Sequence, residues 1–329
     1  MKTRLAVGML LLVCAAASAM ADNGNWLTAV QDWPLAQAEK PKAGQPAAGP
    51  VEKVQQEQAE APAKKCPFNF TIDYTLISDY VFRGVNLSEY PREGREKLNH
   101  QLNVNPEFNL GNYGVFGAVF WFEWFAAQEQ LTPGYGRDIQ EVDYSVYYRY
   151  TFEDLGLTPE VGWVAYTLPP IGRDAHTDYE FYIKLAYSDG KLFGTKENIL
   201  NPYVAYYHNL DLGANASWWE VGVNHEFALA DYGMKDCPVM RHVSLIPSAI
   251  YGVQHRLFGK LNPDLGGPTT SAVNILFGLE IALDLNGAFN LPEQYGSLTL
   301  SGLLFYSQAL DHALVNDEFF GGMKVGYQW

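Results

Sequence analysis

The chain lacks long apolar segments, has few charged residues and is short of positive charge. After residue 17, no segment reaches the ~20 consecutive apolar residues that a membrane-spanning helix needs. Charged residues make up 18% of the chain, below the ~25% of soluble domains. The formal net charge of −15 argues against a nucleic-acid partner, because phosphates demand a basic surface.

Common catalytic motifs are also missing. The sequence has no Gly-x-Ser-x-Gly, no His-Glu-x-x-His and no Cys-x-x-Cys. Among the seven scattered histidines, His208 and His225 fall on outward faces of neighbouring predicted strands, as a lipid-cleaving enzyme would require. Hairpin pairing, however, sets His208 opposite roughly Glu220 rather than opposite His225 or a serine. We therefore expect no enzyme, no cofactor and no metal; a barrel lipase is the enzymatic alternative.

The first residues are typical of an export signal. Lys2 and Arg4 precede an apolar run over residues 5–17, and small residues follow up to Ala21. We expect cleavage of residues 1–21, which changes the formal net charge from −15 to −17 because Lys2 and Arg4 are lost. The mature chain is then exported from the cytoplasm.

The sequence has three cysteines. Cys14 leaves with the signal peptide, unless it is lipidated, which Val13 disfavours because Gly or Ala is expected there. Cys66 and Cys237 remain, and an oxidising periplasm permits a disulfide between them. Two unrelated thiols are the alternative, and both interpretations stay open.

Residues 22–65 differ in composition from the rest. The part from Pro41 to Lys65 consists largely of Ala, Pro, Gln, Glu and Lys. Such a segment buries too little apolar surface to offset the entropy lost on ordering. We expect a flexible periplasmic arm; a plug or a cell-wall contact through Trp26 and Trp33 is the alternative.

From Cys66 onward, apolar and polar residues alternate. This period of two places successive side chains on opposite faces of a strand. Segments of ~10 residues with this pattern predict a transmembrane barrel, the only spanning structure besides a helix that satisfies every backbone polar group. The segments lie at 68–85, 100–110, 115–125, 140–152, 157–168, 178–187, 201–210, 218–229, 243–254, 272–285, 297–307 and 319–329.

The predicted fold of residues 66–329 is therefore all-β, an antiparallel up-and-down transmembrane β-barrel of about twelve strands. An even number of strands places both termini on the periplasmic side. The connectors at 188–200, 230–242 and 286–296 are longer than periplasmic turns usually are. Ten or fourteen strands are therefore the alternatives.

The last predicted strand ends on an aromatic residue, Trp329, at the final position. Met323, Val325 and Tyr327 share its face. This ending resembles the terminal signature of bacterial outer-membrane β-barrels, in which the last strand closes the barrel and its final aromatic is recognised by the barrel assembly machinery. The resemblance implies an outer-membrane location, with lipid and that machinery as partners. A sheet-closing strand of a soluble β-sandwich is the alternative.

The inward faces of the predicted strands carry more acids than bases. The predicted pore-lining acids are Glu107, Glu141, Asp143, Glu160, Glu180, Glu220, Glu226, Glu280 and Asp284, and the bases are Arg149, Lys184 and Lys324. Acidic rings favour cations in a pore. The alternative is that these charges pair with one another and fill a narrow barrel.

One motif lies in the first predicted strand. It consists of Ser78, Asp79, Tyr80, Val81, Phe82, Arg83 and Gly84. The motif resembles the signature of a family of uncharacterised bacterial outer-membrane proteins, the Gcw_chp-like barrels, and the likeness spans roughly residues 68–329. The resemblance implies a porin-like barrel without naming an activity or a catalytic residue.

In a continuous strand, Asp79 and Arg83 share a face about 13 Å apart, too far for a direct ion pair. We expect each to pair with a charge on a neighbouring strand near the rim and to fix the strand register; solute binding is the alternative. The predicted function is passive diffusion of small cationic or neutral solutes through an outer-membrane channel. A closed structural or adhesive barrel is the alternative.

Overall fold

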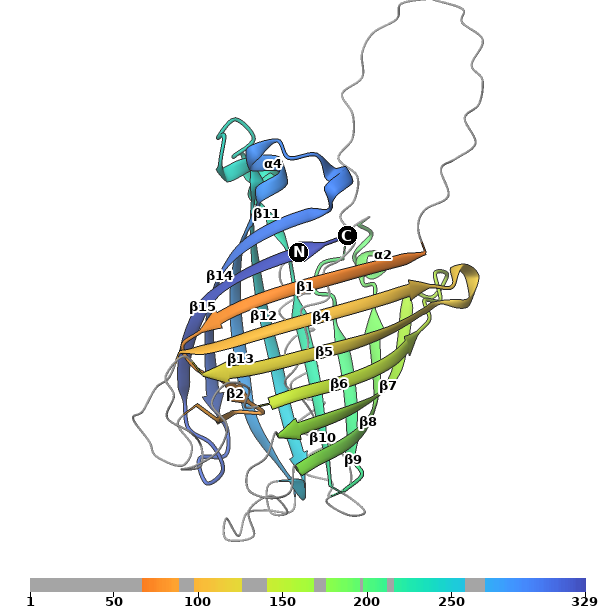
Figure 1. Cartoon of the computed structure of the whole chain (residues 1–329), viewed down its shortest axis with the longest axis vertical. Helices are drawn as coiled ribbons and strands as arrows, with labels where there is room; N and C mark the ends of the chain where they lie inside the picture. Colours follow the sequence, from red (N-terminus) through yellow and green to blue (C-terminus); the bar gives the residue numbers. More distant parts are fainter. Residues whose placement is uncertain are drawn as a thin grey trace, which may run out of the picture.

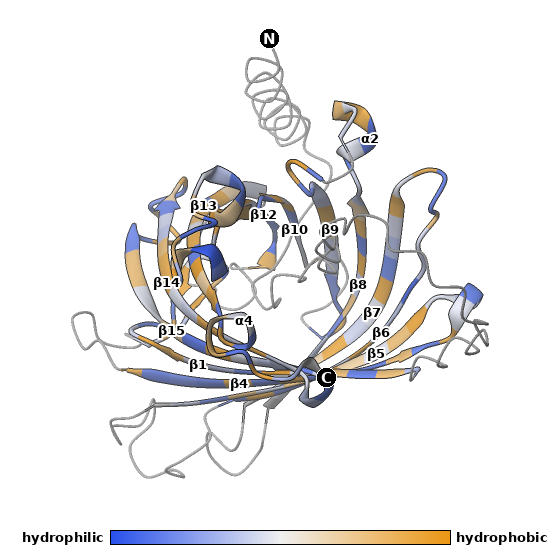
Figure 2. Ribbon diagram, turned by 90° about the horizontal axis from the view of Figure 1, so that it is seen from above, coloured by the Kyte–Doolittle hydropathy of each residue, from blue (hydrophilic) through white to orange (hydrophobic). Residues whose placement is uncertain are grey.

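The computed structural model describes residues 67–88, 98–125, 141–168, 176–195, 198–211, 216–257 and 270–329. Within these residues, twelve long antiparallel strands form a closed barrel, which confirms the predicted fold (Figures 1 and 2). The strands are β1 (Phe68–Ile77), β4 (Asn99–Asn109), β5 (Val115–Phe125), β6 (Glu141–Arg149), β7 (Leu157–Leu168), β8 (His176–Tyr187), β9 (Tyr203–Asn209), β10 (Ser217–Asn224), β12 (Val243–His255), β13 (Thr270–Asp284), β14 (Ser297–Ala309) and β15 (Glu318–Gln328).

The first and last strands close the barrel. β15 pairs with β1 over Thr71–Ile77, and the N–H and C=O groups of Trp329 bond those of Phe70 at 3.0 and 3.1 Å. β9 and β10 are joined by a bond from the Asn209 N–H to the Ala216 carbonyl, at 3.0 Å. Because a closed barrel has no free edge, every long strand has two neighbours.

The two faces of the barrel differ in polarity. On β8, Phe181 and Ile183 are 40% and 45% exposed, whereas Glu180 and Tyr182 are buried. Exposure alternates in a similar way along β6 and β14, and Figure 2 shows the hydropathy changing along the strands. The exposed strand side chains are mainly apolar or aromatic, whereas the buried ones include most of the acids, so the outer face is the more apolar of the two. In the described part of the chain, no helix is long and apolar enough to cross a membrane.

Four connectors at the end where β1 begins hold short elements, and three of them are the long ones at 188–200, 230–242 and 286–296 (Figure 1). Asp189 organises the first of these long connectors by accepting bonds from the N–H groups of Ile199 and Leu200 at 2.8 and 2.7 Å. Short elements, rather than an additional hairpin of barrel strands, occupy the described residues of the three long connectors. The barrel therefore has twelve strands, as predicted. The short elements at this end are η1 (Gly111–Tyr113), α2 (Gly190–Phe193), β11 (Phe227–Ala228), η2 (Leu229–Tyr232), η3 (Met240–His242), α4 (Leu285–Phe289) and η5 (Glu293–Tyr295).

The first strand is shorter than predicted, and the motif at residues 78–84 is not part of it. β1 ends at Ile77, and the motif folds into a separate hairpin of β2 (Val81–Phe82) and β3 (Val85–Asn86). Its two-residue turn uses Arg83 and Gly84, whose φ angles are 53° and 81°. Positive φ at both turn positions matches the twist of a two-residue hairpin. The chain therefore reverses direction after β2 instead of continuing as an extended strand.

Several predictions fall outside the described residues. The signal peptide, the arm over residues 22–65 and Cys66 all lie there. Cys237 lies half-buried in the connector between η2 and η3. The disulfide between the two cysteines therefore stays a prediction.

Candidate functional site in the barrel interior

The β2–β3 hairpin lies inside the barrel, toward the end opposite the start of β1 (Figure 1). Tyr80 and Val81 are 5% and 4% exposed. The Tyr80 ring lies 5.2 Å from that of Trp121 on β5, and a Cβ on Gly84 would lie 3.1 Å from the side chain of Asn274 on β13. The hairpin therefore contacts strands on separate sides of the interior.

Arg83, at the tip of the hairpin, forms a buried bidentate ion pair with Glu180 on β8. Its two terminal nitrogens donate to the two carboxylate oxygens at 2.8 and 2.5 Å, and the Tyr166 hydroxyl donates to Glu180 at 3.1 Å. β8 is five strands away from β1 in the sheet order. The expectation that Arg83 pairs with a neighbouring strand near the rim is wrong, because the hairpin carries it across the interior.

Asp79 also departs from expectation. Its carboxylate accepts from the Asn86 amide at 3.1 Å, within the hairpin segment itself. The buried Ser88 hydroxyl accepts from the Tyr80 N–H at 2.5 Å. These short-range bonds hold the hairpin together locally, so Asp79 stabilises the hairpin rather than the register of β1.

Three aromatic rings surround the Arg83 guanidinium. Its central carbon lies 4.8 Å from the Phe82 ring centre, 5.4 Å from Trp218 and 5.9 Å from Tyr166. Aromatic faces attract cations at these distances. Burial disfavours the charged form, but the surrounding acceptors, led by Glu180, outweigh this, so the pKa of Arg83 lies above its ordinary value. Arg83 is therefore a permanent cation at the centre of the site.

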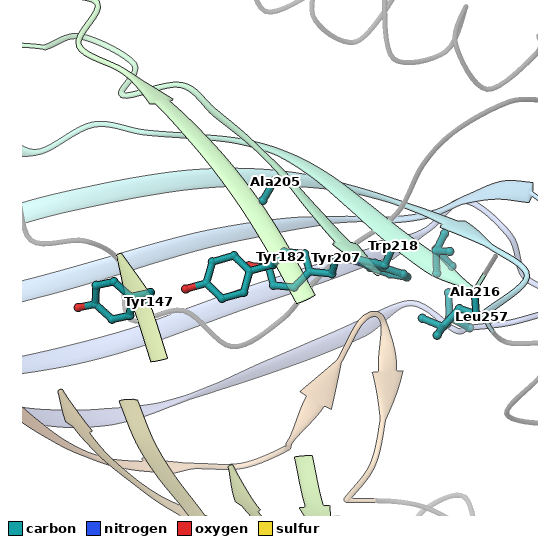
Figure 3. Close-up of a cluster of buried hydrophobic side chains, with 10 residues drawn as sticks. Tyr147, Tyr182, Ala205, Tyr207, Ala216, Trp218 and Leu257 are labelled. Atoms are coloured by element: carbon teal, nitrogen blue, oxygen red, sulfur yellow. The ribbon is translucent and has the colours of Figure 1, made fainter. Parts of the chain in front are cut away.

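Tyrosines fill the interior next to this ion pair. Figure 3 shows Tyr147, Tyr182, Tyr207 and Trp218 following one another along the wall. The rings of Tyr182 and Tyr207 stack with centres 5.0 Å apart. Val85 of the hairpin packs against the same cluster. The hairpin and the tyrosine row thus form one continuous packed unit.

An arrangement of glycine, tyrosine and glutamate occurs three times on the inner wall. The Tyr182 ring lies over Gly162 of β7, where a Cβ would come within 2.5 Å of it, and its hydroxyl donates to Glu160 at 3.0 Å. Only glycine leaves room for the ring to lie flat on the next strand. The other two arrangements are Gly117, Tyr147 and Glu107, with a 2.6 Å bond, and Gly222, Tyr203 and Glu220, with a 2.9 Å bond.

Each base predicted from the sequence lies beside a predicted acid. Arg149 pairs with Glu107 at 2.7 Å, and Lys324 pairs with Glu280 at 2.9 Å. Lys184 lies opposite Glu160 in the β7–β8 register, with its ammonium 4.5 Å from the centre of the Tyr203 ring. The structure thus groups these charges in pairs along the wall rather than in one ring.

Further acids gather on β5 and β6. Glu123 and Glu141 are directly opposite each other in the register, and Asp143 is the next buried carboxylate on β6. Glu123, which the sequence analysis missed, accepts a bond from Asn99 on β4. In the described part of the chain, no group of three or more potential ligands is arranged to hold a metal ion. This group of carboxylates concentrates negative charge on one wall.

Two predicted lumen acids lie at the end where β1 begins. Glu226 is exposed beyond the end of β10 and accepts from the Ser244 hydroxyl at 2.6 Å. Asp284 ends β13 and caps α4 by accepting from the Asn286 N–H at 3.1 Å. Asp73 on β1, by contrast, is a buried acid that the sequence analysis missed. Glu226 and Asp284 lie at or beyond the ends of their strands, because β10 ends at Asn224 and β13 ends at Asp284.

Comparison with known proteins gives distant likenesses only. No protein-family model and no curated protein matches the chain. Among solved structures, a KdgM porin aligns with a TM-score of 0.38 at 10% identity over 79% of this chain and 98% of its own. An outer membrane channel from Pseudomonas putida F1 aligns with a TM-score of 0.44 at 10% identity, over 84% of this chain and 100% of its own.

An enzyme is also among the structural neighbours. Outer membrane phospholipase A from Escherichia coli aligns with a TM-score of 0.36 at 15% identity, over 79% of this chain and 92% of its own. The resemblance of residues 78–84 to the Gcw_chp-like signature has no matching family model and stays a prediction.

Proposed function

We propose that this chain is an outer-membrane channel through which small cationic or neutral solutes diffuse passively. The observation that carries the proposal is the polarity of the barrel, which is apolar outside and charged inside. A soluble protein of this size rarely exposes so much contiguous apolar surface. β4, β5 and β15 have 11 residues each, the length at which a tilted strand spans a bilayer.

The preference for cations follows from the interior charges. The interior acids are the half-buried Glu107 and the buried Asp73, Asp79, Glu123, Glu141, Asp143, Glu160, Glu180, Glu220 and Glu280. Four bases neutralise part of this charge. Arg83 pairs with Glu180, Arg149 pairs with Glu107 and Lys324 pairs with Glu280. Lys184 lies opposite Glu160 in the register of β7 and β8. An acidic surplus lowers the energy of a cation inside a narrow path.

The orientation follows from the connectors. The short turns at Gly111–Tyr113 and residues 153–156 lie at the end where β1 begins and β15 ends. Outer-membrane barrels place such turns in the periplasm. We assign this end, the arm at residues 22–65 and Cys237 to the periplasm, with lipid and the barrel assembly machinery as partners.

A closed structural barrel is the second candidate, and the β2–β3 hairpin favours it. The hairpin carries buried side chains into the interior and packs against the tyrosine row. A filled lumen would leave the outer connectors, rather than the interior, to meet a partner. Solute flux separates the two candidates, because only the channel conducts.

Removing charge from the β5–β6 wall should weaken cation preference. The double variant Glu141→Gln, Asp143→Asn removes two neighbouring negative charges without changing side-chain size. A unit charge about 6 Å from an ion in water contributes about 0.7 kcal/mol, so the cation-to-anion permeability ratio should fall about threefold or more. Reversal potentials across a KCl gradient measure this ratio.

The matched control is Glu226→Gln, which removes a charge from an exposed position outside the strands. The reversal potential of this variant should equal that of the wild type. Equal reversal potentials for the double variant and the wild type would contradict the proposed role of the wall.

A further inference from the structure

We propose that Arg83 and Glu180 set the size limit of the channel by holding the β2–β3 hairpin across the lumen as a latched constriction. This inference rests on the proposed channel function. The motif at residues 78–84 was expected either to fix the strand register or to bind solute. We assign it a different role, which is to narrow the lumen.

The backbone of the hairpin is only loosely tied to the barrel wall. β2 and β3 form a two-stranded sheet of their own, outside the hydrogen-bond network of the barrel strands. Ser78, at its base, bonds β15 through its N–H to the Gly321 carbonyl at 2.9 Å and through its hydroxyl to the Gly321 N–H at 3.1 Å. An isolated two-stranded hairpin is marginally stable in water. Side-chain contacts with the wall must therefore hold this one in place.

The contact with Glu180 is the strongest of these. It is bidentate and buried on both sides, and it joins residues 97 positions apart in the chain. Bidentate arginine–carboxylate pairs combine two charge-assisted hydrogen bonds with a fixed geometry. Losing either partner would leave the other charge buried without its counterion, a state that favours movement of the hairpin toward water.

The backbone of Arg83 is itself held in an uncommon conformation. Its φ of 53° lies in the left-handed region that residues other than glycine seldom occupy. Such a conformation persists where surrounding contacts over-determine it. Here the contacts are the ion pair and the rings of Phe82, Tyr166 and Trp218. The turn conformation thus directs the Arg83 guanidinium across the barrel toward Glu180.

The position of the hairpin makes it a constriction. Its side chains contact β5 through Tyr80, and β7 and β8 through Phe82 and Arg83. The backbone at Gly84 lies beside β13, because an added Cβ would come within 3.1 Å of the Asn274 side chain. Val81 packs against a second cluster formed by Ile77, Leu276 and Phe320. A solute that crosses the barrel must pass the space left between the hairpin and these walls, so release of the hairpin widens the path.

The test uses the full-length protein refolded from Arg83→Gln and Glu180→Gln variants. Each variant breaks the ion pair with side chains of similar size. Single-channel conductance should rise about twofold or more, and liposome swelling should admit larger neutral sugars than the wild type does. Arg241→Gln is the matched control, because it removes an arginine that is exposed in η3, at the opposite end of the barrel from the hairpin. The control should keep the wild-type size limit.

Two further variants keep the test decisive if a single substitution prevents folding. The exchange Arg83→Glu with Glu180→Arg restores the pair in reverse and should return conductance toward the wild-type value. Replacing residues 80–87 with a Gly-Ser segment of equal length removes the hairpin side chains and should give the largest path. Folding of every variant is checked by heat-modifiable mobility on gels.

The outcomes separate the latch from the channel. A conducting wild type whose size limit is unchanged in Glu180→Gln and in the Gly-Ser variant overturns the latch and leaves the channel standing. A silent wild type with a conducting Gly-Ser variant overturns the proposed channel of the wild type and supports the hairpin as the element that blocks the path. Silence in all variants overturns both proposals.

Discussion

Replacing Ile183 with arginine should sharply reduce the fraction of the protein that folds into lipid vesicles. Ile183 lies near the middle of β8, is 45% exposed and points away from the interior. If the outer face meets hydrocarbon, an arginine there costs about 2–4 kcal/mol near the bilayer midplane. Urea titrations of folding in vesicles, read by heat-modifiable mobility on gels, measure the change in the free energy of unfolding.

The matched control is Tyr113→Arg. Tyr113 is 77% exposed in η1, a turn at the end of the barrel. Arginine at this position stays in water or among headgroups, so the free energy of unfolding should change little. If Ile183→Arg is as well tolerated as Tyr113→Arg, the outer face of β8 does not lie in the hydrocarbon.

Replacing Gly162 with valine should also destabilise the barrel strongly. The Cβ alone would come within 2.5 Å of the Tyr182 ring, which lies flat over the glycine. The ring must then move, which disturbs its 3.0 Å bond to Glu160 and its stacking on Tyr207. Overpacking of this kind typically costs about 1–3 kcal/mol. The same vesicle titration measures it.

Gly302→Val tests whether the collision, rather than loss of a strand glycine, causes this effect. A Cβ on Gly302 of β14 would meet nothing within 4 Å, so this substitution should be nearly neutral. Combining Gly162→Val with Tyr182→Leu, which removes the ring, should recover part of the stability. Equal stabilities for the Gly162 and Gly302 variants would contradict the packing that the structure shows.

The architecture could be predicted because the period of two is a local signal. Along β8, Phe181, Ile183 and Leu185 alternate with Glu180, Tyr182 and Lys184, and the two sets differ in polarity. Burial follows the same alternation. The pairing of β15 with β1 follows from closing the barrel, because the first and last strands would otherwise be free edges.

The hairpin could not be predicted in the same way. The alternation of β1 continues past Ile77, so residues 78–85 are compatible with a longer strand. The turn signal was weak because Arg83 precedes Gly84 where Asn or Asp usually stands in a hairpin turn. Contact with Glu180 depends on the three-dimensional closure of the barrel, and no local pattern encodes a partner 97 residues away.

The inner wall shows a similar limit. Gly117, Gly162 and Gly222 are visible in the sequence, but the tyrosine that covers each one depends on the register between strands. Glu123 was missed although the alternation of β5 extends to it. Its place opposite Glu141 emerges once the β5–β6 register is known. Side-chain pairs across strands need the fold before they can be assigned.

Planar-bilayer recording of the refolded wild-type protein tests the central claim most directly. We expect discrete conductance steps. In a KCl gradient, the sign of the reversal potential should show that potassium is more permeant than chloride. Purified protein that is folded by gel mobility, inserts into the bilayer and yet produces no conductance would contradict the channel.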